Sequence, residues 1–520
     1  MAPKYTDVIA GGQKMKAKFQ KASCVLCSAA LLLGALSGCT KKAAPTSKVD
    51  TSKSVQLQVY LVGDAPKGLD KVSDKINELS KKDINATVKF SFTTWTDYAN
   101  KYNLLISSGE PIDLLYTAPW LSYGSYAQKG AFMSLNTLLP KYAPELYKFV
   151  SQNDWKLCEL NGKIYTMPST YKEYFSDELI YREDLRKKYN LPVPNTFEKC
   201  EQYMLGIKKN MPSQMITNTT GSSFLFLKDN EDSLETQNYG MQFNYYHPTK
   251  ITQYWGSSKF LTNMKNIKRW ADEGLWSKSI LSDKTDSNDF NNGKIVISAA
   301  GINPSKYIGS VSKIKQAHPD WEVGFVQGAE NVDYSAFNNH PLTNGFAIPV
   351  TSKNPERALM FYQKLVLDKT YNQLSEYGIQ GVDYTVENGQ YKQIGDSFGY
   401  EGMNGWSWRN PQYMLKTSDT DALNTVFDSL SKVVAKHPAK YSAKITDGFS
   451  EDTTSYENEL AAVNTVVTQY LNPLLHGEVD DVDQATSIFM TKVKAAGLEK
   501  VQQGWQKQWL AYCKQYGYTD

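Results

Sequence analysis

The sequence has few of the residues and motifs from which metal sites and phosphate-binding loops are built. Its five histidines are isolated, with no HExxH motif and no pair at helical spacing, which argues against a zinc hydrolase. It has no GxGxxG after a predicted strand, no GxSxG elbow, and no GxxxxGK followed by Ser or Thr. We therefore expect no cofactor, no resident metal and no ATPase activity of its own.

Paired carboxylates give no catalytic signal either. With 54 Asp and Glu residues, adjacent acids such as Asp177 and Glu178 are expected on a solvated surface rather than as a glycosidase pair. Asp283, Asp286 and Asp289 lack the alternate spacing of a calcium loop and its bidentate glutamate. No catalytic or metal-binding residue is predicted.

The balance of charges argues against a protein whose main task is to bind a highly charged polymer. The 57 Lys and Arg residues nearly cancel the 54 Asp and Glu residues, which leaves a formal net charge of +3. We therefore expect no nucleic-acid partner. A hydrophobic content of 41% and a mean hydropathy of -0.48 are typical of a globular chain. At about 100 to 200 residues per domain, the length suggests about three domains, or two large ones with an extension.

Cysteine is also scarce, with six in the chain. Cys24 and Cys27 lie in an apolar N-terminal run, so their CxxC spacing is not interpreted as a redox or zinc motif. Cys158, Cys200 and Cys513 are widely separated and allow at most one disulfide. We expect them to be buried free thiols.

The N-terminal segment has the pattern of a bacterial lipoprotein signal. Four lysines precede an uncharged run of about 15 residues at 22–36, shorter than the roughly 20 needed to span a bilayer. Leu36-Ser37-Gly38-Cys39 resembles a lipobox, so residues 1–38 are predicted as the signal peptide and Cys39 as the lipidation site. Residues 39–54 are polar and are predicted as a flexible tether. The alternative is an ordinary signal or an uncleaved anchor.

The globular part begins with alternating strand and helix patterns. We predict strands at 55–62, 88–92 and 112–116 and helices at 69–81 and 98–106. This order implies an α/β fold with a largely parallel sheet, in which ligands bind beyond the carboxyl ends of the strands. The residues at those ends are Asp64, Trp95, Tyr116, Thr117 and Trp120.

The later parts of the chain continue this mixture and then become helical. A strand followed by a helix is predicted within 176–191, and Thr196 is predicted to cap another helix. Further predicted elements are strands at 295–300, 321–326 and 345–350, a helix at 355–367, and helices from 455 to 516 broken by Pro473 and Gly477.

Six segments follow one another in a recognisable order. They are SGEPIDLLY (108–116), GAFMSL (130–135), NGKIYTMP (161–168), LIYREDL (179–185) with PNTF (194–197), FNNGKI (290–295) and NPERA (354–358). Together they resemble a known family, the extracellular solute-binding proteins of bacterial ABC importers, in particular the carbohydrate-binding branch. YGIQGVDY (377–384) resembles a lipoprotein subgroup that carries an extra C-terminal helical region. The chain departs from the family pattern at Ile112, where Pro is common, and at Asn161, where Asp is common.

The resemblance implies a type II periplasmic-binding-protein-like fold, with two α/β lobes joined by a hinge and a C-terminal helical extension. The predicted division is 55–168 and 328–380 for lobe one, 169–327 and 381–450 for lobe two, and 451–520 for the extension. The implied protein is a monomer without enzyme activity, held by the lipid on Cys39 at the extracytoplasmic face of the membrane. It would close on an oligosaccharide and deliver it to the permease subunits of an ABC transporter.

A sugar-binding surface needs flat aromatic rings beside polar side chains, because sugars combine apolar C–H faces with hydroxyls. Besides the strand-end residues, the candidate contacts are Tyr171, Tyr174, Asn303, Trp406, Trp408 and Arg409. The competing interpretation of each aromatic is core packing or ordinary surface. A peptide or another small polar ligand is an open alternative, and a secreted carbohydrate-active enzyme or a purely structural lipoprotein are others.

Overall fold

The computed structural model describes residues 50–94, 97–229, 234–283, 288–328 and 336–519. The predicted signal peptide, most of the tether, Cys39 and Trp95 lie outside these residues. Within the described ranges, no helix combines the length and apolarity needed to cross a membrane.

Lobe one is built around a five-stranded sheet with the order β2-β1-β3-β15-β6. Its strands are β1 (Val55–Val62), β2 (Ala86–Thr93), β3 (Leu114–Thr117), β15 (Gly345–Ala347) and β6 (Thr166–Pro168). The strand β1 pairs in parallel with β2 and β3, whereas β15 runs antiparallel to β3 and β6. The predicted parallel strands are therefore confirmed.

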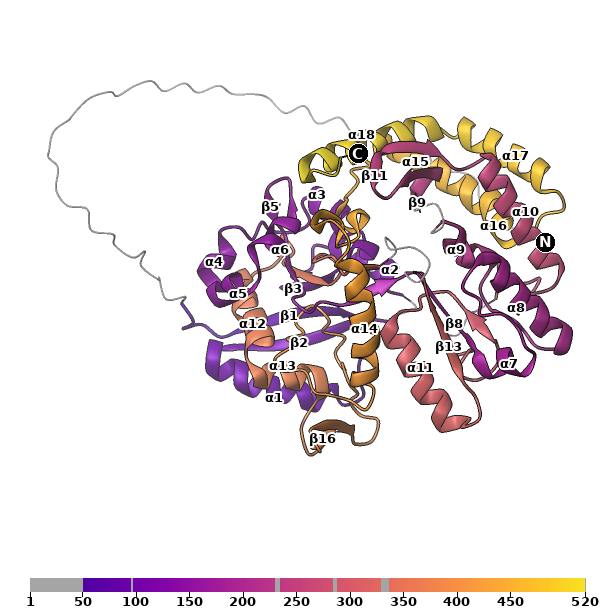
Figure 1. Cartoon of the computed structure of the whole chain (residues 1–520). Helices are drawn as coiled ribbons and strands as arrows, with labels where there is room; N and C mark the ends of the chain where they lie inside the picture. The colour runs from indigo at the N-terminus through magenta and orange to yellow at the C-terminus, as the bar shows by residue number, and fades with distance from the viewer. Residues whose placement is uncertain (1–49, 95–96, 230–233, 284–287, 329–335, 520) are drawn as a thin grey trace, which may run out of the picture. The chain divides into compact units, whose positions relative to one another are not determined.

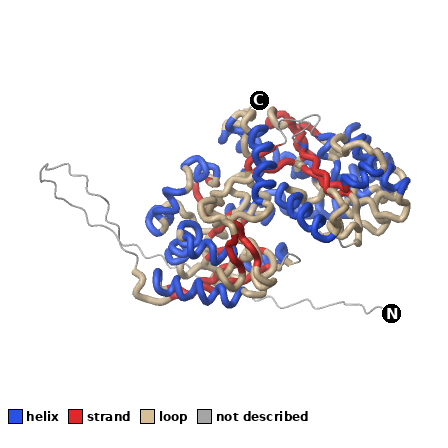
Figure 2. The backbone as a smooth tube through the Cα atoms, turned by 60° about the horizontal axis from the view of Figure 1, so that its bottom comes forward, coloured by secondary structure: helices blue, strands red, loops and turns tan. Residues whose placement is uncertain are grey.

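Helices cover this sheet. The principal ones are α1 (Leu69–Ile84), α2 (Tyr98–Ser107), α12 (Pro355–Leu367) and α13 (Lys369–Tyr377), with the shorter α3 (Tyr123–Gln128), α4 (Leu138–Tyr142), α5 (Pro144–Phe149) and α6 (Gln152–Leu157). The helices α1, α12 and α13 pack together beside the sheet (Figure 1). In α1 the buried stripe includes Val72 and Ile76, and in α12 it includes Leu359 and Phe361; burial of these side chains stabilises the layer. Figure 2, which draws helices in blue and strands in red, shows this helical surround.

Lobe two has a smaller sheet, in which β8 (Glu178–Arg182) lies antiparallel between β12 (Ile297–Ser298) and β13 (Val323–Gln327). Its principal helices are α7 (Glu183–Lys188), α8 (Phe197–Asn210), α10 (Ser258–Asp272) and α11 (Pro304–Ala317). The side chain of Thr196 accepts a hydrogen bond from the amide of Lys199, so the predicted helix cap is confirmed. In the core, Trp270 stacks on Phe197 with ring centroids 4.5 Å apart.

A second group of elements in lobe two carries residues that line a cavity described below. These elements are η2 (Gly221–Phe224), α9 (Phe226–Asp229), β9 (Leu234–Thr236), η4 (Asn238–Gly240), β10 (Met241–Asn244) and β11 (His247–Gln253). The strands form an antiparallel sheet with the order β11-β10-β9.

Two short strands follow the chain's passages between the lobes. The strand β7 (Tyr174–Ser176) pairs antiparallel with β14 (Ala336–Asn338), and α14 (Thr420–Val434) packs against both. A paired crossing of this kind is suited to a hinge, because it lets two lobes rotate without breaking either core.

The residues after 380 differ from the predicted division. We expected 381–450 in lobe two, but Phe398, Met403 and Trp408 are fully or almost fully buried in the hydrophobic core of lobe one. The hairpin of β16 (Tyr384–Glu387) and β17 (Gln390–Gln393) precedes this segment. The segment stays in lobe one because burial of these large apolar side chains in its core is favourable. The next helix, α14, packs instead against β7 and β14.

The C-terminal region is helical, as predicted. It contains α15 (Glu457–Val466), a π-helical turn η10 (Val467–Leu471), α16 (Asn472–His476), α17 (Val482–Ala495) and α18 (Leu498–Tyr516). Gly477 ends α16 with φ of 72°, and Gly497 makes a further break with φ of 98°. Side chains of this region, including Phe489 and Val501, join the core of lobe two.

Cys158, Cys200 and Cys513 are buried and free, as expected. Burial raises the pKa of Cys200 well above its usual range, so this thiol stays protonated and behaves as a small apolar group.

The position of Gly345 in the central sheet gives a stability test. A Cβ built there would lie 2.3 Å from Oγ1 of Thr166, so Gly345→Ala is expected to lower the free energy of unfolding by about 1–3 kcal/mol. In the control Gly309→Ala, within α11, a Cβ meets nothing within 4 Å, and stability should rise by about 0.5–1 kcal/mol. Urea denaturation measures both, and equal effects would contradict the packing of β15.

Candidate functional site

Tyr116 lies at the centre of an aromatic group at the carboxyl end of β3. Its ring is fully buried, and its hydroxyl donates a hydrogen bond to Oδ1 of Asn344. It meets Phe346 edge to face at 5.6 Å and Trp406 at 5.9 Å between ring centroids. The four residues of β3 are all buried, so the strand holds Tyr116 in a fixed position.

Trp120 forms the exposed part of this group. It sits in the short helix η1 (Pro119–Leu121), where 46% of its surface is exposed. Its ring lies 6.3 Å from that of Tyr116 and packs edge to face against Tyr98 at 5.5 Å. An indole supported on two sides and exposed on the rest provides a flat surface that can stack on a sugar ring.

The glycine-rich loop 399–410 brings Trp406 to Tyr116 from a distant part of the chain. Asn404 Nδ2 donates to the carbonyl of Val62 at 3.0 Å, which fixes the loop at the end of β1. Ser169 Oγ donates to the carbonyl of Trp406 at 3.1 Å, and Trp406 Nε1 donates to Glu401 at 3.2 Å. The loop is therefore hydrogen-bonded both to the sheet of lobe one and to the first crossing segment.

Arg409 is a buried cation in the same loop. It is 6% exposed, and its guanidinium binds Glu173 at 3.3 Å and also pairs with Glu401. Its Cζ lies 5.6 Å from the ring centroid of Tyr171, within cation–π range. Burial disfavours the charge of Arg409, but Glu401 and Glu173 outweigh this and hold its pKa above the usual range.

A further carboxyl group, Glu376, is buried close to this ion-pair cluster. Burial raises the pKa of Glu376 to about 8, while the charge of Arg409 opposes the shift and that of Glu401 adds to it. Burial likewise raises the pKa of Glu173, against the effect of Arg409. The cluster therefore has more acidic groups than basic ones.

The structure thus brings Tyr116, Trp120, Tyr171, Trp406 and Arg409 into one group, because the rings of Trp120 and Trp406 pack on Tyr116 and Arg409 lies over Tyr171. Within it Tyr116 and Arg409 are buried. Two other predicted contacts are also buried. Thr117 is buried, with its Oγ1 3.0 Å from that of Thr166, and Trp408 is fully buried and stacks on Phe346 at 5.1 Å.

The remaining predicted contacts lie apart from this group or outside the described residues. Tyr174 is in β7 and packs against Phe427 at 6.0 Å. Asn303 caps α11, where its side chain accepts from the amide of Lys306 at 2.8 Å. Asp64 is exposed beyond β1, and Trp95 lies outside the described residues.

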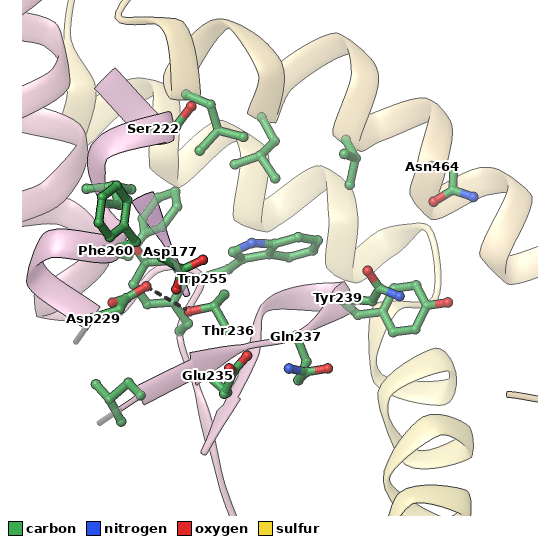
Figure 3. Close-up of a pocket in the computed structure, with 18 of the residues that line it drawn as sticks. Asp177, Ser222, Asp229, Glu235, Thr236, Gln237, Tyr239, Trp255, Phe260 and Asn464 are labelled. Atoms are coloured by element: carbon green, nitrogen blue, oxygen red, sulfur yellow. Dashed lines mark hydrogen bonds between the residues drawn. The ribbon is translucent and has the colours of Figure 1, made fainter. Parts of the chain in front are cut away.

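A cavity of about 490 Å³ lies in lobe two beside the C-terminal region, and its lining contains none of the predicted contact residues. Its lining includes Asp177, Asp229, Glu235, Tyr239, Trp255, Lys444 and Asn464. Figure 3 shows Trp255 pointing into it, with Asp229, Thr236 and Glu235 on one side and the helix of Asn464 on another. A second cavity of about 380 Å³ shares Gln237 and Asn238 with it and reaches the 119–125 segment of lobe one.

Sequence reasoning missed this cavity. The available signal was Tyr254-Trp255-Gly256, an aromatic pair before a glycine with φ of 76°. Aromatic pairs before a glycine are also common in hydrophobic cores. The sequence therefore could not show whether Trp255 lines a cavity or is buried in the core.

Glu376 predicts a pH dependence of stability. Its pKa is about 8 in the folded protein, above its ordinary value near 4.5, so folding favours the protonated form. This group therefore makes the free energy of unfolding fall as the pH rises from about 4.5 to 8. Glu376→Gln, which keeps an uncharged side chain of similar shape, should be more stable than wild type above pH 8, with the difference vanishing near pH 4.5. Denaturation at several pH values measures this, and a constant difference would contradict the assignment.

Comparison with known proteins places the chain in a family. Residues 74–382 match the family model "Bacterial extracellular solute-binding protein", and residues 445–514 match a "Domain of unknown function". A curated relative from Streptococcus pneumoniae serotype 4, "Carbohydrate ABC transporter substrate-binding protein", is 25% identical over 507 residues, covering 96% of this chain and 98% of the relative.

Solved structures share the fold. The N-glycan transport solute binding protein NgtS from Streptococcus pneumoniae is similar with a TM-score of 0.70 and 21% identity, covering 89% of this chain and 99% of that one. The alginate-binding protein AlgQ2 is similar with a TM-score of 0.63 and 18% identity, again over 89% and 99%. The predicted type II fold is confirmed, and the chain belongs to the bacterial extracellular solute-binding protein family.

Proposed function

We propose that this chain is the substrate-binding subunit of an ABC importer and captures an oligosaccharide between its lobes. The observation that carries the proposal is the match to the curated carbohydrate-binding relative along 96% of the chain. A match of this length covers both lobes and the C-terminal region, so it supports the whole function rather than a shared module.

The geometry supports a saccharide ligand. Trp120 and Trp406 offer rings around the buried Tyr116, and the ring of Tyr171, on the first crossing segment, lies 5.6 Å from the guanidinium of Arg409. Rings of this kind stack on the C–H faces of sugars, and nearby polar groups bind the hydroxyls. A ligand that touches both lobes favours the closed state by its difference in affinity, and a permease can recognise that state.

The proposed activity is binding without catalysis. The family consists of binding proteins, and two carboxylates of the aromatic group, Glu173 and Glu401, both pair with Arg409. A retaining or inverting glycosidase needs one carboxyl group as acid and a second as nucleophile or base. Two carboxylates held by one guanidinium are better suited to fixing the loop than to those roles. The same pairing argues against a peptide ligand, because Arg409 is already occupied as an anchor for a carboxylate.

The proposed location is the extracytoplasmic face of the membrane, with a lipid on Cys39 as the anchor and the permease subunits as partners. Family membership supports the extracytoplasmic side. The lipobox-like Leu36-Ser37-Gly38-Cys39 supports the anchor.

Calorimetric titration of residues 40–520 with neutral oligosaccharides tests the binding function, with chromatography of the sugars afterwards. We expect saturable binding and intact sugar.

Trp120→Ala should weaken binding about 10-fold or more, because it removes a stacking surface without disturbing the core. Leu281→Ala is the matched control, since Leu281 is similarly exposed at 52% but lies in lobe two away from the aromatic group. Cleavage of the sugar, or equal affinity of the two variants, would contradict the proposal.

The anchor has a separate test. Cys39→Ala removes the only thiol that the lipobox-like motif offers for lipidation, so the protein should move from the membrane fraction to the medium or periplasm. Metabolic labelling with a fatty acid should mark the wild type alone, and labelling of the variant would show that Cys39 is not the site.

A further inference from the structure

The cavity in lobe two has a mixed lining. Lobe two contributes acidic and amide side chains, including Asp177, Asp229, Glu235 and Gln237, together with apolar and aromatic ones such as Leu225, Phe226 and Trp255. The C-terminal region contributes Asn464 and the apolar Val467, Leu471 and Leu475. We propose that this cavity binds sugar residues of the oligosaccharide and selects against sugars that carry an acidic group. This inference rests on the proposed function and adds a second surface to it.

Trp255 is held so that its ring faces the cavity (Figure 3). It packs edge to face on Phe489 of α17 at 5.2 Å. On the other side lies Gly240, where a Cβ would come within 2.3 Å of the indole, so only glycine leaves room for this ring. Gly240 also has φ of 71°, a conformation that other residues rarely adopt. The fold therefore fixes an indole at this wall.

The C-terminal region positions the opposite side of the cavity. Gln502 Nε2 donates to the carbonyl of Tyr239 at 2.7 Å, and Tyr239 donates its hydroxyl proton to Glu451 at 3.0 Å. The same region reaches lobe one, because Tyr516 donates to the carbonyl of Glu159 at 2.9 Å. The segment 445–514, which matches a domain of unknown function, thus supplies one wall of the cavity. It also contacts lobe one, because Gln128 Nε2 donates to the carbonyl of Ser450 at 2.9 Å.

The linings of the two cavities have more acidic than basic side chains. Asp177, Asp229 and Glu235 line the first cavity, and Asp447 and Glu451 line the adjoining one. Among the described residues of both linings, Lys444 is the one basic side chain, and it pairs with Glu235 at 3.3 Å. Asp229 is also paired from outside the lining, by Lys259 at 3.5 Å.

This arrangement suits hydroxyl groups and opposes acids. Carboxylate and amide oxygens accept hydrogen bonds from sugar hydroxyls, while Trp255 and the apolar C-terminal side chains contact C–H faces. A uronic acid, sialic acid or sulfate would lie among like charges with its nearest cation already paired, so it would lose its hydration without a compensating partner.

The test compares one saccharide in two charge states. The neutral tetrasaccharide that binds tightest in calorimetry is oxidised at its primary hydroxyls to carboxylates and titrated again. We expect the oxidised form to bind at least 10-fold more weakly. Asp177→Lys reverses the charge of an exposed side chain of the lining, so the ratio of the two affinities, neutral over oxidised, should fall severalfold. Asp320→Lys, exposed between α11 and β13 and outside the lining, should keep the wild-type ratio.

Trp255 tests whether sugar enters this cavity. Trp255→Ala should weaken binding of the neutral tetrasaccharide about 10-fold, and Trp255→Tyr, which keeps a ring, should retain more affinity at a similar melting temperature.

Equal or tighter binding of the oxidised form by the wild type overturns the proposed selection against acidic sugars and leaves the proposed function intact. Unchanged affinity in Trp255→Ala overturns the use of the cavity. An absence of binding by every neutral saccharide overturns the proposed function itself, and this inference with it.

Discussion

The aromatic group of lobe one, which we propose as a sugar-binding surface, surrounds one buried positive charge. Arg409 is 6% exposed, and a guanidinium so far from water is tolerated only when it is paired. One partner, Glu401, lies in the same glycine-rich loop, and the other, Glu173, lies far away in sequence on the first crossing segment. The pairing with Glu173 therefore joins the loop to the crossing segment. Together with the hydrogen bonds of Asn404 and Ser169, it fixes the loop in which Trp406 packs against Tyr116.

The two lobes contribute different chemistry to the proposed capture of a saccharide. Lobe one presents indole and phenol rings that suit the apolar faces of sugars, with their cation and carboxylates committed to one another. Lobe two, with the C-terminal region, presents one indole at Trp255 and a group of carboxylates. A ligand that needs both surfaces binds the closed state more tightly than the open one, and this difference is the only free energy available to drive closure.

Much of the fold could be predicted because its signals are local. The strand Val55–Val62 and the helix Pro355–Leu367 begin and end where alternation and helical spacing place them. The lobe assignment of Trp408 and the position of Trp255 could not be predicted in this way. Both depend on which core a loop side chain enters, and that choice is set by contacts with residues far away in sequence, such as Phe346 for Trp408 and Phe489 for Trp255. Asn303 was predicted as a ligand contact because it is polar and follows a strand, but its side chain accepts a hydrogen bond at the start of α11 and so has a structural role there.

The most direct test of the central claim is a crystal structure of residues 40–520 grown with a saturating neutral oligosaccharide. The account predicts electron density for intact sugar between the lobes, with one ring stacked on Trp120 or Trp406 and another residue beside Trp255. Density for cleaved sugar, or for sugar bound away from both aromatic surfaces, would contradict it.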